Sequence, residues 1–165
     1  EEEVEAFLAR ENPGKPHLAE MLVRYGYVPD RGTAFNEYLN ASSLPSRYIT
    51  PEEAIRGILG AGGIPVLAHP WFGSGSERLT AEEMKHRLYR LTEYGLLGVE
   101  AVYSGFSPCQ RQDMLAFADR FGLYVTAGSD YHGKNKKIRL GDSGLDAYEV
   151  WPAGLRRFLE DVRRE

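Results

Sequence analysis

The chain has 165 residues, 42% of them hydrophobic and 27% charged, and a formal net charge of −4. This length suits one domain with a substantial core, and the slightly acidic charge argues against a protein that wraps long nucleic acid without excluding a small phosphorylated ligand. A single cysteine, Cys109, rules out an internal disulfide and favours a reduced, cytoplasmic setting, and no apolar run in the sequence is long enough to span a membrane.

Helical patterns fill the first part of the chain. Apolar residues recur with the period of a helix over Glu1–Glu11 and again over residues 14–28. The Ser/Pro-rich stretch Asn40–Arg47 (NASSLPSR) is the best internal boundary. We therefore expect a helical subdomain over residues 1–47 and an α/β subdomain over residues 48–165.

Beyond this boundary, strand and helix patterns alternate. Helix starts are expected at Thr50, Thr80 and Ser107, where a capping residue precedes an amphipathic stretch. The alternation predicts parallel βαβ units. The expected strands are Ile64–Ala68, Leu96–Tyr103, the run that begins at Leu123, and a last short strand over Ala147–Trp151, before a final helix over Pro152–Arg163.

Two of these strands are followed by residues of the kind that bind metals. Asp130 and His132 stand two positions apart in AGSDYHG, so in an extended chain both side chains leave on one side. His69 stands at the end of GGIPVLAHP. Because the loops after parallel strands meet at one edge of a sheet, the sequence predicts one metal site formed by His69, Asp130 and His132. The alternative is a turn with incidental histidines.

Other residues are open to two interpretations. Glu100 interrupts an apolar strand, so it either points into the site or ties down a neighbouring loop. Trp71 and Phe72 could stack on a ring or cover the core. Cys109 at a helix start has the position of an activated thiol, but no base is near it in sequence, so a nucleophilic role is not expected.

Basic residues offer candidate phosphate contacts at two places. Lys15 and His17 begin a helix, where an anion could bind, although the residues alone favour a solvated turn. The segment Lys134–Arg139 (KNKKIR) could hold a phosphate beside the metal site, or it is an exposed basic loop.

Three motifs, GKPHLAEMLVRYGYV, AHP and GSDYHG, together resemble the PHP (polymerase and histidinol phosphatase) family in order and spacing. The likeness is greatest to its bacterial phosphoesterases, which act on nucleoside 3′,5′-bisphosphates and short RNA 5′ ends. The resemblance implies a seven-stranded (β/α) barrel with more than one Mn, Fe or Zn ion at its strand ends, and a helical insertion over that site.

The resemblance also implies roles for individual residues. His69, Asp130 and His132 would be metal ligands, and Glu100 would be a further ligand or lie just behind them. Lys15 and His17 would contact the substrate phosphate, which raises them above the solvated turn that the residues alone suggest.

The sequence departs from the family at its start, because the HxH motif of the family's first strand is absent. We therefore expect the C-terminal portion of a PHP barrel that hydrolyses phosphate mono- or diesters of small nucleotides or short RNA ends only with the missing half. Alone it should bind metal weakly. Two alternatives stay open, an association module with a vestigial half-site that pairs through exposed strand edges and an amidohydrolase-like metal hydrolase.

Overall fold

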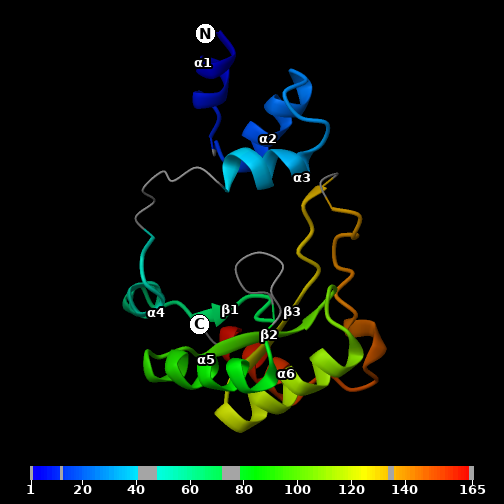
Figure 1. Ribbon diagram of the computed structural model, residues 1–165. Helices are drawn as coiled ribbons and strands as arrows, with labels where there is room; N and C mark the ends of the chain where they lie inside the picture. The colour runs from blue at the N-terminus through cyan, green and yellow to red at the C-terminus, as the bar shows by residue number, and fades with distance from the viewer. Residues whose placement is uncertain (1, 12, 41–47, 72–78, 134–135, 164–165) are drawn as a thin grey trace. The chain divides into compact units, whose positions relative to one another are not determined.

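The computed structural model describes residues 2–11, 13–40, 48–71, 79–133 and 136–163. The chain divides into two compact units, Glu1–Tyr48 and Ile49–Glu165 (Figure 1). Within the described residues, no helix is both long enough and apolar enough to cross a membrane.

The first unit is helical throughout its described regular structure. It contains α1 (Glu2–Leu8), α2 (Lys15–Arg24), the single turn α3 (Arg31–Thr33) and the π-helix η1 (Ala34–Leu39). Pro16 occupies the first turn of α2, where its missing N–H costs nothing. A small core of Ala19, Val28 and Ala34 holds α2 to the segment α3–η1.

The second unit is built on a sheet of three parallel strands, β1 (Val66–Leu67), β2 (Gly98–Tyr103) and β3 (Tyr124–Gly128), in that order across the sheet. Val66 pairs with Gly98, and Gly98 with Tyr124, so the carboxyl ends of the strands lie at the same edge. The register of β2 against β3 shifts by one residue between Glu100 and Val102.

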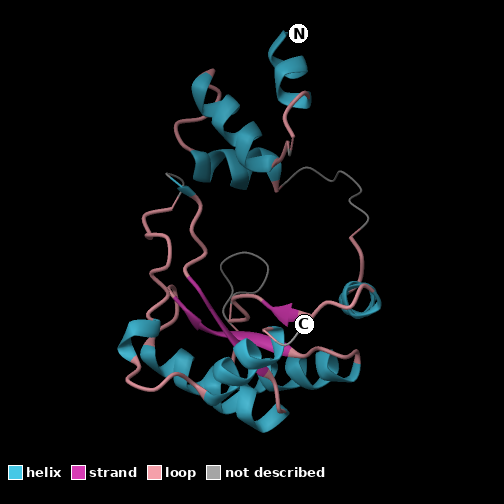
Figure 2. Cartoon of the chain, turned by 180° about the vertical axis from the view of Figure 1, so that it is seen from behind, coloured by secondary structure: helices cyan, strands magenta, loops and turns pink. Residues whose placement is uncertain are grey.

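Helices connect and cover these strands. They are α4 (Pro51–Gly60), α5 (Ala81–Glu93), α6 (Pro108–Phe121) and α7 (Ala153–Val162), with a short 3₁₀ turn η3 (Leu145–Ala147) before the last. A capping box starts each of α4, α5 and α6, with Thr50, Thr80 and Ser107 as the capping residues. The capping side chain accepts a hydrogen bond from the backbone N–H of the third helical residue, and the side chain of that third residue accepts one from the backbone N–H of the capping residue. Figures 1 and 2 both show α5 and α6 along one side of the sheet.

The core of this unit lies between the sheet and its helices. Its fully buried large side chains come from each layer, with Met84 and Leu88 on α5, Val99 and Val102 on β2, Met114 on α6 and Val125 on β3. Gly154 lets α7 approach β3, since a Cβ there would lie 2.8 Å from Cγ2 of Val125. The mixed helix and parallel-strand architecture confirms the expected α/β class.

Some expected elements differ from the structure. The strand expected over Ile64–Ala68 shortens to Val66–Leu67. The positive φ of His69 turns the chain just after its C-terminal end. The strand expected over Ala147–Trp151 is wrong. Gly144 turns the chain into the 3₁₀ turn η3, from which Leu145 and Tyr148 pack against the core. Val150 and Trp151 are 69% and 47% exposed, so the stretch does not continue as a half-buried strand. Three strands lie within the described residues, and the seven-stranded barrel stays an expectation.

Candidate functional site

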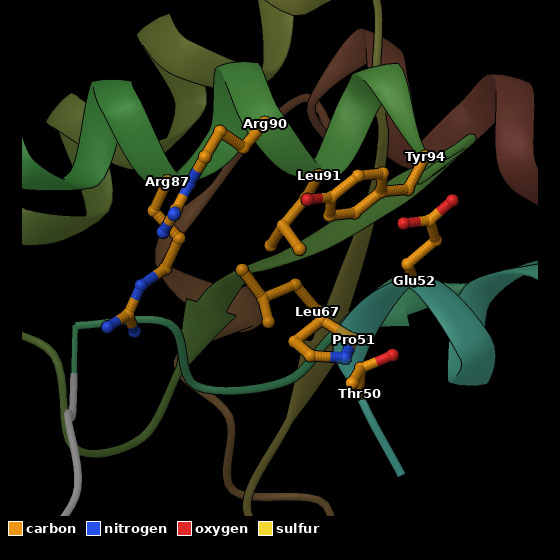
Figure 3. Close-up of a pocket in the computed structure, with 8 residues that line it drawn as sticks. All are labelled: Thr50, Pro51, Glu52, Leu67, Arg87, Arg90, Leu91 and Tyr94. Carbon is orange, nitrogen blue, oxygen red and sulfur yellow. The ribbon is translucent and has the colours of Figure 1, made fainter.

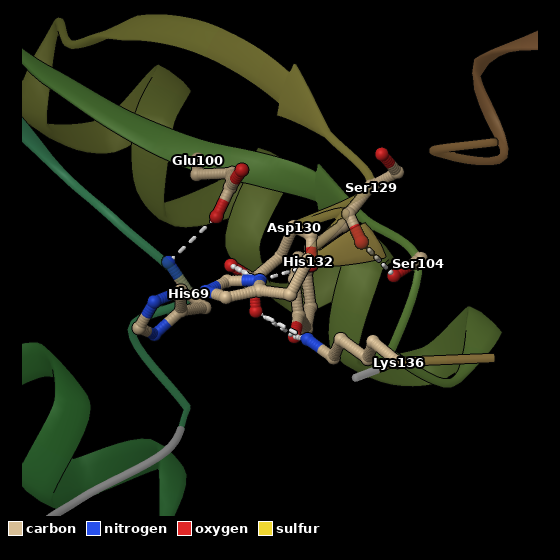
Figure 4. A network of polar contacts seen from close by, with 8 residues as sticks. His69, Glu100, Ser104, Ser129, Asp130, His132 and Lys136 are labelled. Carbon is tan, nitrogen blue, oxygen red and sulfur yellow. Dashed lines mark hydrogen bonds and ion pairs between the residues drawn. The ribbon is translucent and has the colours of Figure 1, made fainter. Parts of the chain in front are cut away.

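Polar side chains gather where the three strands end (Figure 4). His69 follows β1 with a φ of 31°, and its backbone N–H donates a hydrogen bond of 2.7 Å to Oε2 of Glu100 on β2. The other carboxylate oxygen of Glu100 faces Gly128 on β3, where any Cβ would overlap it. A carboxylate on the central strand therefore contacts both neighbouring strands and holds the turn that carries His69.

The register shift in β2 brings Tyr103 to the same place. Glu100 and Tyr103 are three residues apart, which in a regular strand puts side chains on opposite faces. One extra residue in the pairing with β3 reverses the alternation beyond it. The ring of Tyr103 consequently lies 5.7 Å from the imidazole of His69, centroid to centroid, with an interplanar angle of 50°.

Asp130, just beyond β3, is the centre of a small polar network. The hydroxyl of Tyr103 donates to Oδ2 of Asp130 at 3.1 Å, and the ammonium of Lys136 forms an ion pair with the same oxygen. Lys136 also donates to the Tyr103 hydroxyl at 2.9 Å and lies 5.4 Å from the centre of its ring. Tyr103 thus links His69 to the carboxylate of Asp130.

This network changes the acidity of both charged groups. Burial acts to raise the pKa of Asp130, but the hydrogen bonds from Lys136 and Tyr103 and the charges of Lys136 and His132 outweigh it and lower that pKa. Burial likewise opposes the charge on Lys136, yet its hydrogen bonds to Asp130 and Tyr103 raise its pKa. Asp130 is consequently held as a carboxylate and Lys136 as an ammonium.

His132 turns back onto Asp130. Its Nδ1 lies 2.8 Å from the backbone oxygen of Asp130 and 3.4 Å from Oδ1, while its side chain is 62% exposed. The extended geometry expected between these two residues is wrong, because Asp130 has a left-handed φ of 51°. A tight turn, not a strand, brings the imidazole and the carboxylate together.

The predicted metal ligands are near one another without forming one cluster. Asp130 and His132 are in direct contact, whereas His69 reaches Asp130 through Tyr103. Across the described part of the chain, no group of three or more His, Cys, Asp or Glu side chains is arranged to hold a metal ion. The donor types suit a divalent metal, but their present arrangement does not enclose one. Their assignment as ligands stays a prediction.

The phosphate contacts predicted at Lys15 and His17 belong to the first unit. Lys15 Nζ lies 3.5 Å from Oδ1 of Asn40. Nδ1 of His17 is buried and has no hydrogen-bond partner among the described residues. Their role in binding a phosphate stays a prediction as well.

The remaining candidates are placed clearly where they are described. Trp71 is only 3% exposed and donates from Nε1 to the backbone oxygen of Gln110 at 3.0 Å, so it covers the core. Cys109 is exposed, with Sγ 3.8 Å from a carboxylate oxygen of Asp113, a neighbour that does not favour a thiolate. Phe72 and Lys134 lie outside the described residues.

Sequence reasoning missed Tyr103 and the specific role of Lys136. Tyr103 ends β2, so the rule that singled out His69 and Asp130 could have found it. The sequence singles out Lys136 only as one member of the basic segment Lys134–Arg139. Nothing in the sequence shows that it folds back to Asp130, six residues earlier.

Comparison with curated proteins shows relatives over most of this chain. A 3′,5′-nucleoside bisphosphate phosphatase from Chromobacterium violaceum is 30% identical over 135 residues, which cover 80% of this chain and 44% of that enzyme. The 5′-3′ exoribonuclease Rnm from Escherichia coli is 31% identical over 143 residues, which cover 84% of this chain and 45% of that enzyme. The chain is related to the PHP phosphoesterases. This PHP-related chain spans slightly under half the length of these relatives. No family model matches it.

Solved structures give the same relationship. A protein from Bifidobacterium adolescentis assigned as a metal-dependent phosphoesterase is 33% identical, with a TM-score of 0.66 over 89% of this chain and 50% of its own. A Chromobacterium violaceum protein described as an amidohydrolase was solved with sulfate and without metal. It is 27% identical, with a TM-score of 0.67, and the match covers 92% of this chain and 52% of that protein.

Proposed function

We propose that this PHP-related chain supplies part of the active site of a metal-dependent phosphoesterase that hydrolyses phosphate mono- or diesters of small nucleotides or of short RNA ends. One observation carries the proposal: in a chain about 30% identical to a nucleotide phosphatase and an exoribonuclease, two imidazoles and a carboxylate stand at one edge of a parallel sheet. Phosphoesterases of this kind use metal-bound water as nucleophile.

We propose further that His69, Asp130 and His132 provide only some of the ligands. Support comes from their arrangement, since His69 contacts Tyr103 and not the Asp130–His132 pair directly. Metal affinity depends on ligand number and charge, so this chain alone should retain Mn, Fe or Zn weakly and release little phosphate. Full activity would then need ligands beyond these residues, such as the HxH pair that the family carries elsewhere.

The test is to purify the chain, dialyse it against Mn²⁺ or Zn²⁺, and measure bound metal together with phosphate release from adenosine 3′,5′-bisphosphate. We expect less than one metal per chain, and a further loss in His69→Ala and Asp130→Asn. His86→Ala is the matched control, because His86 is a 75%-exposed histidine on α5 that pairs with Glu82.

Two results would count against the proposal. Equal metal retention in all three variants would show that His69 and Asp130 do not bind the metal. Tight binding of several metals by the unmodified chain would contradict the partial site.

An amidohydrolase activity is the second candidate, favoured by the description of the Chromobacterium violaceum structure. The same metal-loaded preparations assayed with linear and cyclic amides separate the two reactions. Amide cleavage without phosphate release would replace the phosphoesterase proposal. If neither occurs and no metal binds, an association module that pairs through the edge strands β1 and β3 becomes the better account.

A further inference from the structure

The second unit contains a pocket of about 590 Å³ between α4 and α5, separate from the polar network at the strand ends (Figure 3). This volume is within the range of small-molecule sites, roughly 300–1,000 Å³. One wall is a single stripe of α5, because residues spaced by three and four positions share a helix face. The stripe consists of Arg87, Arg90 and Leu91 of α5 and of Tyr94, the residue that caps the helix.

The pocket has one cationic end and an apolar floor. Figure 3 shows the guanidinium groups of Arg87 and Arg90 together at one side, with Tyr94 and Glu52 at the other. Leu67 of β1, Leu91 of α5 and Pro51 of α4 lie between the two ends. Two forked cations close together match the oxygens of a phosphate, and the floor between the ends offers apolar surface to a flat ring.

The nearby acids make their hydrogen bonds and ion pairs elsewhere, and Glu83 acts on Arg87 through its charge without a hydrogen bond. Glu83, one turn before Arg87, is committed to the capping box of α5, where its carboxylate accepts from the backbone and hydroxyl of Thr80 at 2.8 and 2.7 Å. Glu52, at the other end, is paired with Arg56 at 2.8 Å. Among the described residues, the guanidinium groups of Arg87 and Arg90 make no side-chain hydrogen bond or ion pair.

We propose that this pocket binds a mononucleotide-like ligand, with its phosphate on Arg87 and Arg90 and its ring over Leu67 and Leu91. The ring then lies beside Tyr94, and the carboxylate of Glu52 accepts hydrogen bonds from amino or hydroxyl groups at the far end of the ligand. The residues that line the pocket do not include His69, Asp130 or His132, so this proposal does not depend on the proposed hydrolytic function.

The probe is AMP, titrated into the whole chain in the presence of EDTA and followed by calorimetry and by amide chemical shifts. Saturable binding is expected, with shifts at Leu67, Leu91 and Tyr94. Adenosine and inorganic phosphate should each bind at least about ten-fold more weakly than AMP, because each lacks one half of the recognised chemistry.

The double variant Arg87→Ala/Arg90→Ala should weaken AMP binding by about ten-fold or more, because it removes both charge-assisted contacts. Arg156→Ala is the matched control on the exposed face of α7 and should bind AMP like the unmodified chain. Alanine favours helices, so both variants should keep their helical circular dichroism.

Asp130→Asn separates this proposal from the hydrolytic one, because it removes the strand-end carboxylate and should leave AMP affinity unchanged. The pocket is excluded if AMP fails to bind, or if adenosine or phosphate alone binds as tightly. It is also excluded if Asp130→Asn, and not the double arginine variant, abolishes binding.

Discussion

Asp130 and Lys136 carry the main electrostatic interaction of the strand-end network. Tyr103 is hydrogen-bonded to Asp130 and to Lys136, and the Asp130 carboxylate accepts hydrogen bonds from Tyr103 and from Lys136. Asp130 is only 26% exposed, so water weakens the ion pair less than it would at an open surface. The pair holds Lys136 against the end of β2, and it keeps in place a carboxylate that we propose as a metal ligand.

The opposite pKa shifts define the pH range over which this pair stabilises the metal-free chain. The pKa of Asp130 lies below its ordinary value of 3.8, so its contribution is present above that value and is lost as pH falls through the lowered pKa. The pKa of Lys136 lies above 10.5, so its contribution is present below that value and is lost as pH rises through the raised pKa.

Asp130→Asn should therefore lower the free energy of unfolding by roughly 1 kcal/mol at neutral pH. The difference from the unmodified chain should vanish at pH values well below 3.8, where Asp130 is protonated in both states. Urea unfolding at several pH values measures it, with the exposed Asp119→Asn as control. A difference that is the same at every pH would show that the ion pair is not its cause.

At the scale of elements, the central strand β2 organises the site. Its register shift against β3 puts Glu100 and Tyr103 on the same side, and Glu100 then contacts the turn after β1 and the end of β3. Gly128 is required there because a side chain would occupy the space of the Glu100 carboxylate.

Gly128→Ala should destabilise the chain by roughly 1–3 kcal/mol, because the added methyl group displaces Glu100 from the backbone N–H of His69. The cost should be much smaller in a Glu100→Ala background, where no carboxylate is displaced. A double-mutant cycle by urea unfolding measures this coupling.

The matched control for that cycle is Gly57→Ala in α4, where a Cβ meets nothing within 4 Å and should not destabilise. An equal cost of Gly128→Ala in both backgrounds would place the strain somewhere other than Glu100.

At the scale of the whole molecule, the chain consists of two units with separate cores. The larger core runs from Ile55 to Leu155 with flanking side chains as far as Leu159, and all of its described members lie in the second unit. The smaller core centres on Ala19, Val28 and Ala34. The side chains of each core are therefore buried by residues of their own unit.

A chain reduced to Ile49–Glu165 should keep the sheet and its helices and unfold cooperatively in urea, at a midpoint close to that of the same transition in the intact chain. Far-UV circular dichroism and tryptophan fluorescence follow the transition, since Trp71 is buried in this core. A non-cooperative transition, or loss of the buried tryptophan signal, would show that the first unit is needed to complete the fold.

The sequence by itself determined the local features. The helix starts at Thr50, Thr80 and Ser107 could be predicted because a capping box is closed by residues three positions apart. Short motifs also predicted that a strand ends before His69 and another before Asp130. The same motifs carried the likeness to the PHP phosphoesterases.

Only the tertiary structure decided how the strand ends meet. The register shift in β2, the left-handed turn at Asp130 and the return of Lys136 depend on pairing between segments that are distant in sequence or on a single backbone angle. The pocket on α5 likewise needs Leu67 and Pro51 from other elements. Periodicity reports which face a residue occupies along one element, and it carries no information about which other element lies opposite that face.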